Sequence, residues 1–100
     1  MTDTSFLERL ESIIQARIQE SPEDSYTAKL AQKGILAAAQ KLGEEGVEAA
    51  LAAAAQSDAD LTNEAADLLF HLLVVLSIRG IPLASVIDTL AQRHTVRPVR

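Results

Sequence analysis

The chain has 100 residues, 48% of them apolar and only 3% aromatic, and its formal net charge is −5 at pH 7. This length predicts one domain with a small core, and the acidic charge argues against general nucleic-acid binding, which needs basic surface. The absence of cysteine excludes disulfides and thiolate metal sites. Alanine and leucine outnumber the β-branched residues that strands favour, so the composition predicts an all-α protein.

The sequence also favours a cytoplasmic protein without a membrane partner. Residues 1–13 lack the charged-then-apolar pattern of a signal peptide. The longest uncharged run, residues 68–78, is too short to span a bilayer and contains a histidine.

The first half of the chain predicts two helices. Apolar residues recur with a period of 3.6 over residues 6–18, and this amphipathic helix should end near Pro22, because proline cannot continue a helix. A polar connector follows, in which Ser25 or Thr27 could cap a short helix over residues 28–33. Gly34 ends that helix.

Three more helices are expected downstream. The first is alanine-rich and covers residues 35–55, and the second covers residues 61–79 after a break in which Asp58 or Asp60 is the expected cap. The second is apolar on nearly every side, so it should be largely buried. The last covers residues 83–94, followed by a loose tail.

The expected fold is therefore a small bundle of four main helices plus a short one. A single domain should occupy residues 1–95, and residues 96–100 should form the tail. So small a helical chain can gain a larger core by pairing with a copy of itself, so a homodimer is expected.

Three polar residues interrupt the apolar helix at spacings of three and four. Glu64, Asp67 and His71 therefore share one stripe of it. Buried carboxylates are costly unless they are paired or bind a cation. Alternatively, Glu64 and Asp67 merely decorate the first turn, where the helix dipole favours acids.

A second acid pair with the same spacing lies in the alanine-rich helix. Glu45 and Glu48 are three apart, with Glu44 one step round the helix. If the two helices pack side by side, four carboxylates converge, and a hard divalent cation such as Mg²⁺ or Mn²⁺ would balance their charge. The alternative is a solvated glutamate face. Gly43 and Gly46 weaken this helix, and the metal-site interpretation gives them a role, because they would let another helix or a phosphate-bearing ligand approach its backbone.

Together these motifs resemble the all-α nucleotide pyrophosphatases, the MazG-like superfamily. The resemblance is carried by EExxE at residues 44–48, ExxD at residues 64–67 and SYTAKL at residues 25–30, with the late Arg93-His94 pair. It covers about residues 5–94 and is closest to the phosphoribosyl-ATP pyrophosphatase branch of histidine biosynthesis. Phe70 stands where that branch has tyrosine, which keeps the ring and loses a hydroxyl.

The resemblance implies hydrolysis of phosphoribosyl-ATP to phosphoribosyl-AMP and pyrophosphate at the α–β phosphate bond. It implies that Glu45, Glu48, Glu64 and Asp67 hold the Mg²⁺, and that Glu44 acts beside them as a water-orienting group or a further ligand. The expected catalytic set is these five acids: Glu44, Glu45, Glu48, Glu64 and Asp67.

Cationic groups should bind the substrate's phosphates. The candidates are Lys33 and Lys41 first, then Lys29 and Arg93. Lys41 could equally be the i, i+4 partner of Glu45. His71, also a candidate at the substrate site, could instead hydrogen-bond near Asp67 or be a satisfied core histidine.

Three alternative functions remain open at this stage. A house-cleaning enzyme of the same superfamily would use identical chemistry on non-standard or deoxy nucleoside triphosphates. A di-iron bundle would need Glu-x-x-His pairs, whereas this chain has Glu-x-x-Glu and Glu-x-x-Asp. A non-catalytic dimerisation module would leave the acid cluster facing solvent without metal dependence.

Overall fold

Five α-helices make up the computed structural model of the chain, which describes residues 2–95. They are α1 (Phe6–Ile18), α2 (Tyr26–Lys33), α3 (Ile35–Ala55), α4 (Asp58–Ile78) and α5 (Leu83–Thr95). No strand occurs among residues 2–95, so the prediction of an all-α fold is confirmed. The expected tail at residues 96–100 lies outside the described residues.

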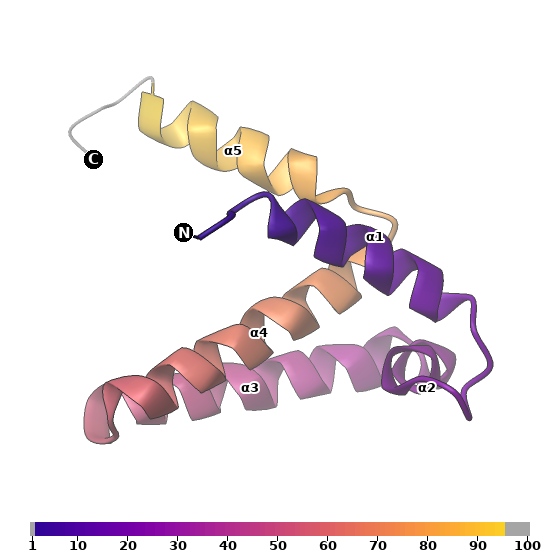
Figure 1. The fold of residues 1–100 in the computed structure, drawn as a ribbon, viewed down its shortest axis with the longest axis horizontal. Coiled ribbons are helices and arrows are strands. Elements are labelled where there is room, and N and C mark those ends of the chain that lie inside the picture. The colour runs from indigo at the N-terminus through magenta and orange to yellow at the C-terminus, as the bar shows by residue number, and fades with distance from the viewer. Residues whose placement is uncertain (1, 96–100) are drawn as a thin grey trace.

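The two long helices form an antiparallel hairpin that organises the molecule (Figure 1). α3 and α4 pack along each other, joined by a tight turn at Gln56 and Ser57. α2 meets the start of α3 at Gly34, and α1 packs on both α2 and α4. The acid pair at Glu64 and Asp67 on α4 is thereby brought beside the helix that carries Glu45 and Glu48.

Local signals explain where most helices begin and end. Ser25 caps α2 by accepting a hydrogen bond from the Ala28 N–H at 3.1 Å. At the end of α4, Gly80 has a φ of +70°. This left-handed residue lets the Ile81 N–H bond back to the Leu76 carbonyl at 2.9 Å, as in a Schellman motif.

Two expectations about α4 were wrong. The helix begins at Asp58 rather than Leu61, and its cap is Ser57, whose Oγ accepts from the Asp60 N–H at 3.1 Å. It is also not largely buried, since Leu69 on it is 46% exposed. The physical reason is that α1 and α2 pack on only part of α4, whereas α3 runs along it (Figure 1).

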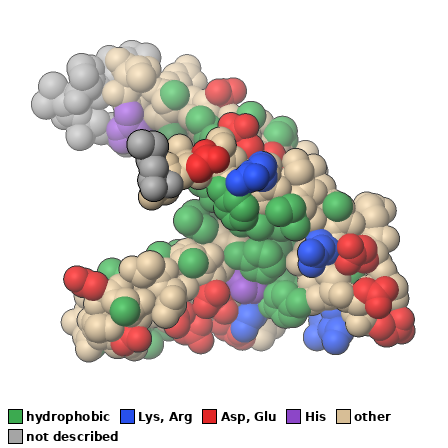
Figure 2. Space-filling model, in the orientation of Figure 1, with side chains coloured by type: hydrophobic (Ala, Val, Ile, Leu, Met, Phe, Trp, Pro, Cys, Tyr) green, Lys and Arg blue, Asp and Glu red, His purple; other side chains and the backbone are tan. Residues whose placement is uncertain are grey.

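The hydrophobic core is formed by residues of all five helices. Its buried members come from every helix: Ile14, Leu30, Ala38, Leu73, Val74 and Leu83. Leu83 is also held through its N–H, which donates to Glu11 Oε2 at 2.7 Å. Beyond this anchor, α5 projects past α1, and the space-filling view is hollowed between that arm and the α3–α4 hairpin (Figure 2).

By length and composition, α4 is the one helix within residues 2–95 that could cross a membrane. It carries Glu64 and Asp67 within its span and packs along α3. A core helix of a soluble bundle has the same composition, and carboxylates in a membrane interior are costly. We therefore describe α4 as a bundle helix.

Candidate active site

Three carboxylates from the two long helices converge on one point. Glu45 and Glu48 come from α3 and Glu64 from α4, and each offers an oxygen lying within 4.8 Å of the others'. Glu45 is buried, Glu64 is half-buried and Glu48 is exposed. Figure 2 shows acidic side chains gathered along the lower edge of the molecule, with basic side chains beside them. Thus the i, i+3 spacing on α3 and the packing of α4 bring together three of the four predicted ligands.

The buried oxygens of this group lack partners. Glu45 Oε2 and Glu64 Oε2 are both buried without a hydrogen bond, and Glu45 as a whole is only 5% exposed. A buried carboxylate oxygen without a partner is unfavourable unless a cation or donor binds it. The donor set contains only carboxylate oxygens, which suits Mg²⁺ or Mn²⁺.

The three carboxylates also repel one another. The pKa of Glu48 is raised above 4.5, first by its hydrogen bond and charge interaction with Glu45, then by desolvation and by Glu64. Lys41 supplies the nearest countercharge, with its Nζ 3.4 Å from Glu45 Oε1. Its pKa is raised, mainly by that same contact. One lysine balances only part of the charge of three acids.

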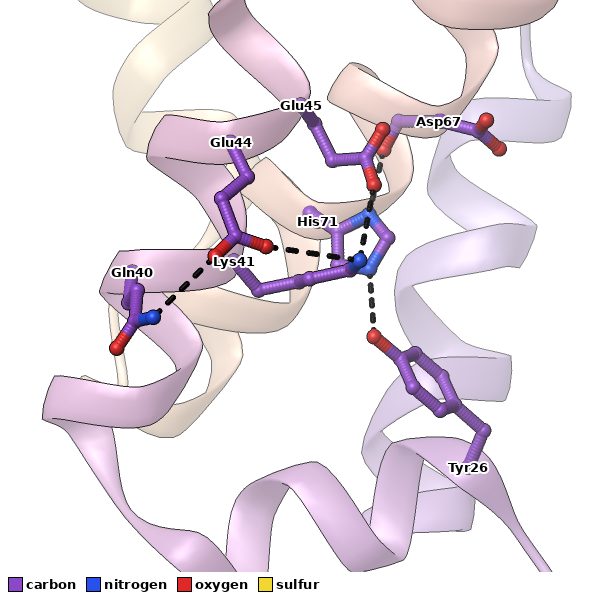
Figure 3. A network of polar contacts seen from close by, with 7 residues as sticks. All are labelled: Tyr26, Gln40, Lys41, Glu44, Glu45, Asp67 and His71. Atoms are coloured by element: carbon purple, nitrogen blue, oxygen red, sulfur yellow. Dashed lines mark hydrogen bonds and ion pairs between the residues drawn. The ribbon is translucent and has the colours of Figure 1, made fainter. Parts of the chain in front are cut away.

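Asp67 is the predicted ligand that the structure leaves outside this group. Its side chain is exposed and points away from Glu45 (Figure 3). Only its backbone carbonyl oxygen takes part nearby, by accepting from His71 Nδ1 at 2.7 Å. Asp67 lies one turn after Glu64, so its role as a ligand stays a prediction.

Glu44 lies at the rim of the site with an exposed carboxylate. It accepts a hydrogen bond from Gln40 Nε2 at 3.2 Å and lies 3.8 Å from Lys41 Nζ (Figure 3). These contacts hold the Glu44 carboxylate beside the other acids while it stays exposed to solvent. Such a position suits a group that orients water.

A cavity of about 350 Å³ lies between α2 and α3, and Lys41 in its lining contacts Glu45 of the carboxylate group. It is lined by Tyr26, Leu30, Lys33, Ala37, Gln40, Lys41 and Glu44. Lys33 and Lys41, the two cations predicted first for phosphate binding, therefore share one cavity. Of the other two, Lys29 is exposed on α2, and Arg93 lines a separate cavity of about 260 Å³ on α5.

His71 is a buried, fully bonded side chain. A carbonyl oxygen can only accept, so Nδ1 carries the proton that it shares with the Asp67 backbone. Nε2 then accepts from the Tyr26 hydroxyl at 2.9 Å (Figure 3). Because both ring nitrogens are engaged, the geometry supports the reading of a satisfied core histidine. It also offers no imidazole to a di-iron centre.

Tyr26 is a residue of this region that the sequence argument missed. The SYT motif drew attention to Ser25 and Thr27, whose side chains are buried. The sequence did offer one indication of its importance, because Tyr26 is one of only three aromatic residues in the chain. Its partner His71 lies 45 positions away, which no local pattern reveals.

The glycines of α3 do not accommodate a close helix contact within the described residues. A Cβ atom added at Gly43 would meet nothing within 4 Å, and one at Gly46 would meet only Leu68 Cδ1 at 4.0 Å. No helix in the described part of the chain approaches the backbone closely at either position. Close approach by a ligand or by a second copy stays a prediction.

Comparison with known proteins places the chain in a family. Residues 7–94 match the family described as phosphoribosyl-ATP pyrophosphohydrolase. This match confirms the branch that the motifs predicted, and it leaves the di-iron reading without support.

Individual relatives agree with the match. The chain is 52% identical over 89 residues to the histidine biosynthesis bifunctional protein HisIE of Escherichia coli, covering 89% of this chain and 44% of the relative. It is similar to HisIE of Xanthomonas campestris at 50% identity, covering 91% and 44%. Its identity to HisIE of Yersinia pestis is 48%, covering 93% and 46%. The chain therefore spans less than half the length of these relatives.

Proposed function

The chain belongs to the phosphoribosyl-ATP pyrophosphohydrolase family, and we propose that it hydrolyses phosphoribosyl-ATP to phosphoribosyl-AMP and pyrophosphate in the cytoplasm. This reaction would serve histidine biosynthesis, the process named for its HisIE relatives. The observation that carries the proposal is the group formed by Glu45, Glu48 and Glu64, with its two unpartnered buried oxygens beside a lysine-lined cavity.

In this proposal Glu45, Glu48 and Glu64 hold Mg²⁺, with Mn²⁺ as a substitute, and Asp67 joins them from the next turn of α4. When bound, the ion would neutralise charge on the carboxylates and on the triphosphate. The unpartnered oxygens of Glu45 and Glu64 support this assignment, because a cation would satisfy both.

The other groups of the site would handle phosphate and water. Lys33 and Lys41 line the cavity and would bind the phosphates as point charges. Lys41, whose pKa is raised by Glu45, stays protonated in that role. Glu44, held by Gln40 and Lys41, would orient the attacking water at the edge of the cluster.

We also infer a homodimer. The chain's radius of gyration is 15.1 Å, whereas a compact chain of this length has about 13 Å. Its accessible surface is 7106 Å², against about 5,500 Å² for a compact monomer of its mass. Apolar side chains remain exposed on the hairpin and on α5, including Leu51 and Leu90.

Pyrophosphate release with Mg²⁺ tests the function directly. Phosphoribosyl-ATP is compared with a panel of ordinary and deoxy nucleoside triphosphates. We expect strong preference for phosphoribosyl-ATP, and loss of turnover in Glu64→Gln, which keeps the side chain's shape and removes its charge. Glu23→Gln, at an exposed position outside the site, is the matched control and should retain full turnover.

Two other outcomes would assign the chain elsewhere. Preference for a deoxy or damaged nucleotide would move the protein to the house-cleaning branch and keep the carboxylate site. No release from any substrate, with or without metal, would favour a non-catalytic dimerisation module.

A further inference from the structure

Tyr26 is held in place by hydrogen bonds that join α2 to α4. Its hydroxyl donates to His71 Nε2 at 2.9 Å, and His71 in turn is fixed by the Asp67 backbone at 2.7 Å. His71 is only 6% exposed, so the histidine end of this hydrogen bond is buried. The phenol ring at the start of α2 therefore has a fixed position relative to α4.

The ring packs against two other rings and is still half exposed. Phe70 and His71 pack against it with ring centroids 6.4 Å and 5.8 Å away, at interplanar angles of 30° and 79°. Tyr26 nevertheless remains 50% exposed, and it lines the cavity shared by Lys33 and Lys41. An exposed, immobilised aromatic ring lies next to two cations.

We propose that Tyr26 is the base-stacking residue of this cavity and that its ring stacks on the purine of the nucleotide substrate. The inference rests on the proposed function and adds the residue that would recognise the base. Stacking on an aromatic ring suits a flat base and needs no preformed hydrogen-bond pattern. The cavity volume of about 350 Å³ lies within the range of small-molecule sites.

The arrangement also orients the nucleotide. Lys41 contacts both Glu44 and Glu45, so the cation side of the cavity leads to the carboxylate group. A base on Tyr26 would place its phosphates toward Lys33, Lys41 and the acids. Ring, lysines and carboxylates thus follow one another in the order base, phosphate and reaction centre.

Intrinsic fluorescence offers a direct test, because Tyr26 is the only tyrosine and the chain has no tryptophan. Wild-type protein with Mg²⁺ is titrated with AMP, and separately with ribose 5-phosphate, which lacks the base. Free N-acetyltyrosinamide in the same titration corrects for absorption by adenine. We expect saturable quenching by AMP and none by ribose 5-phosphate.

Calorimetric titration of AMP into two variants separates the ring from its hydroxyl. Tyr26→Phe keeps the ring and loses the bond to His71, whereas Tyr26→Leu loses both. We expect the dissociation constant of the leucine variant to exceed that of the phenylalanine variant at least about fivefold, the lower end of base–aromatic stacking. Equal losses in both variants would make Tyr26 a positioning residue acting through His71 and overturn the proposal.

Neither readout requires turnover, so the two proposals can fail separately. Pyrophosphate release without AMP quenching would remove the stacking role and leave the enzyme function intact. AMP binding seen by calorimetry without quenching would do the same. Saturable quenching without pyrophosphate release would keep the purine subsite and reject the proposed reaction.

Discussion

Glu48 is the exposed member of the carboxylate group, and its protonation should govern the stability of the metal-free chain. Its pKa in the folded state is raised above 4.5, chiefly by Glu45. The folded chain thus binds a proton more readily than the unfolded chain does. The resulting stabilisation is complete below 4.5 and is lost as the pH rises through the folded-state pKa.

We therefore expect the free energy of unfolding in EDTA to fall as the pH rises through that window. Urea denaturation of the wild type and of Glu48→Gln measures the effect, and the glutamine variant should show a flatter pH dependence. An identical slope in both proteins would mean that Glu48 does not interact with its neighbours as the distances indicate.

Glu64 should couple metal binding to folding. A ligand at about 100 times its dissociation constant stabilises a folded protein by about 2.7 kcal/mol. Mg²⁺ should therefore raise the melting temperature of the wild type by several degrees, and of Glu64→Gln much less. Without metal, the variant should melt at the same temperature or higher, because one of three repelling charges is gone.

Differential scanning calorimetry with and without Mg²⁺ checks this prediction. Glu23→Gln removes one exposed acid elsewhere and should keep the whole Mg²⁺ shift. A full shift in Glu64→Gln would remove Glu64 from the metal site.

Two glycines of α3 should respond in opposite ways to substitution by alanine. One lies at the start of the helix and the other lies within it. Gly34 has a φ of +100° and joins α2 directly to α3, so Gly34→Ala should destabilise the chain by about 1–3 kcal/mol. Gly43 is helical with open space at its Cβ position. Gly43→Ala should stabilise the chain by about 0.5–1 kcal/mol.

Urea denaturation of the two alanine variants compares them directly. A destabilised Gly43→Ala would contradict the open surroundings of that residue in the single chain, and would place a second copy of the chain there. If Gly43→Ala destabilises the protein only at high protein concentration, this would also indicate that a second copy of the chain packs at Gly43.

The ends of several helices could be predicted from the sequence because glycine residues stop them. Gly34 and Gly80 take left-handed backbone conformations at helix ends, and such residues can be recognised from the sequence. The cap of α4 was not predictable, since Ser57, Asp58 and Asp60 are all good capping residues within four positions. Only the packed turn decides that Ser57 accepts the bond.

The candidate site was predictable where helical spacing sets it and not where side-chain direction does. Glu45 and Glu48 share a face of α3 by their spacing, and pairing with α4 adds Glu64. The outward direction of Asp67 and the long-range bond from Tyr26 to His71 depend on tertiary packing. A local pattern contains neither.

At the scale of the whole molecule, the open hairpin and the projecting α5 predict self-association. Val47 and Leu51 on α3 are 60% and 57% exposed, and Leu69 on α4 is 46% exposed. Burying a leucine stabilises an assembly by about 1.5–3 kcal/mol, so a second copy that covers this surface gains a core the single chain lacks. We expect a dimer in sedimentation equilibrium at micromolar concentration.

Leu51→Glu should shift that equilibrium toward monomer, because a buried glutamate at the interface would lack a partner. Gln19→Glu adds the same charge at an exposed position after α1 and should leave the dimer intact. If Leu51→Glu sediments as the wild type does, this surface is not the interface, and the exposed side chains of α5, Ile87 and Leu90, become the next positions to change. If the wild type is monomeric at every concentration, the dimer is rejected. The large accessible surface of the chain would then belong to a stable monomer.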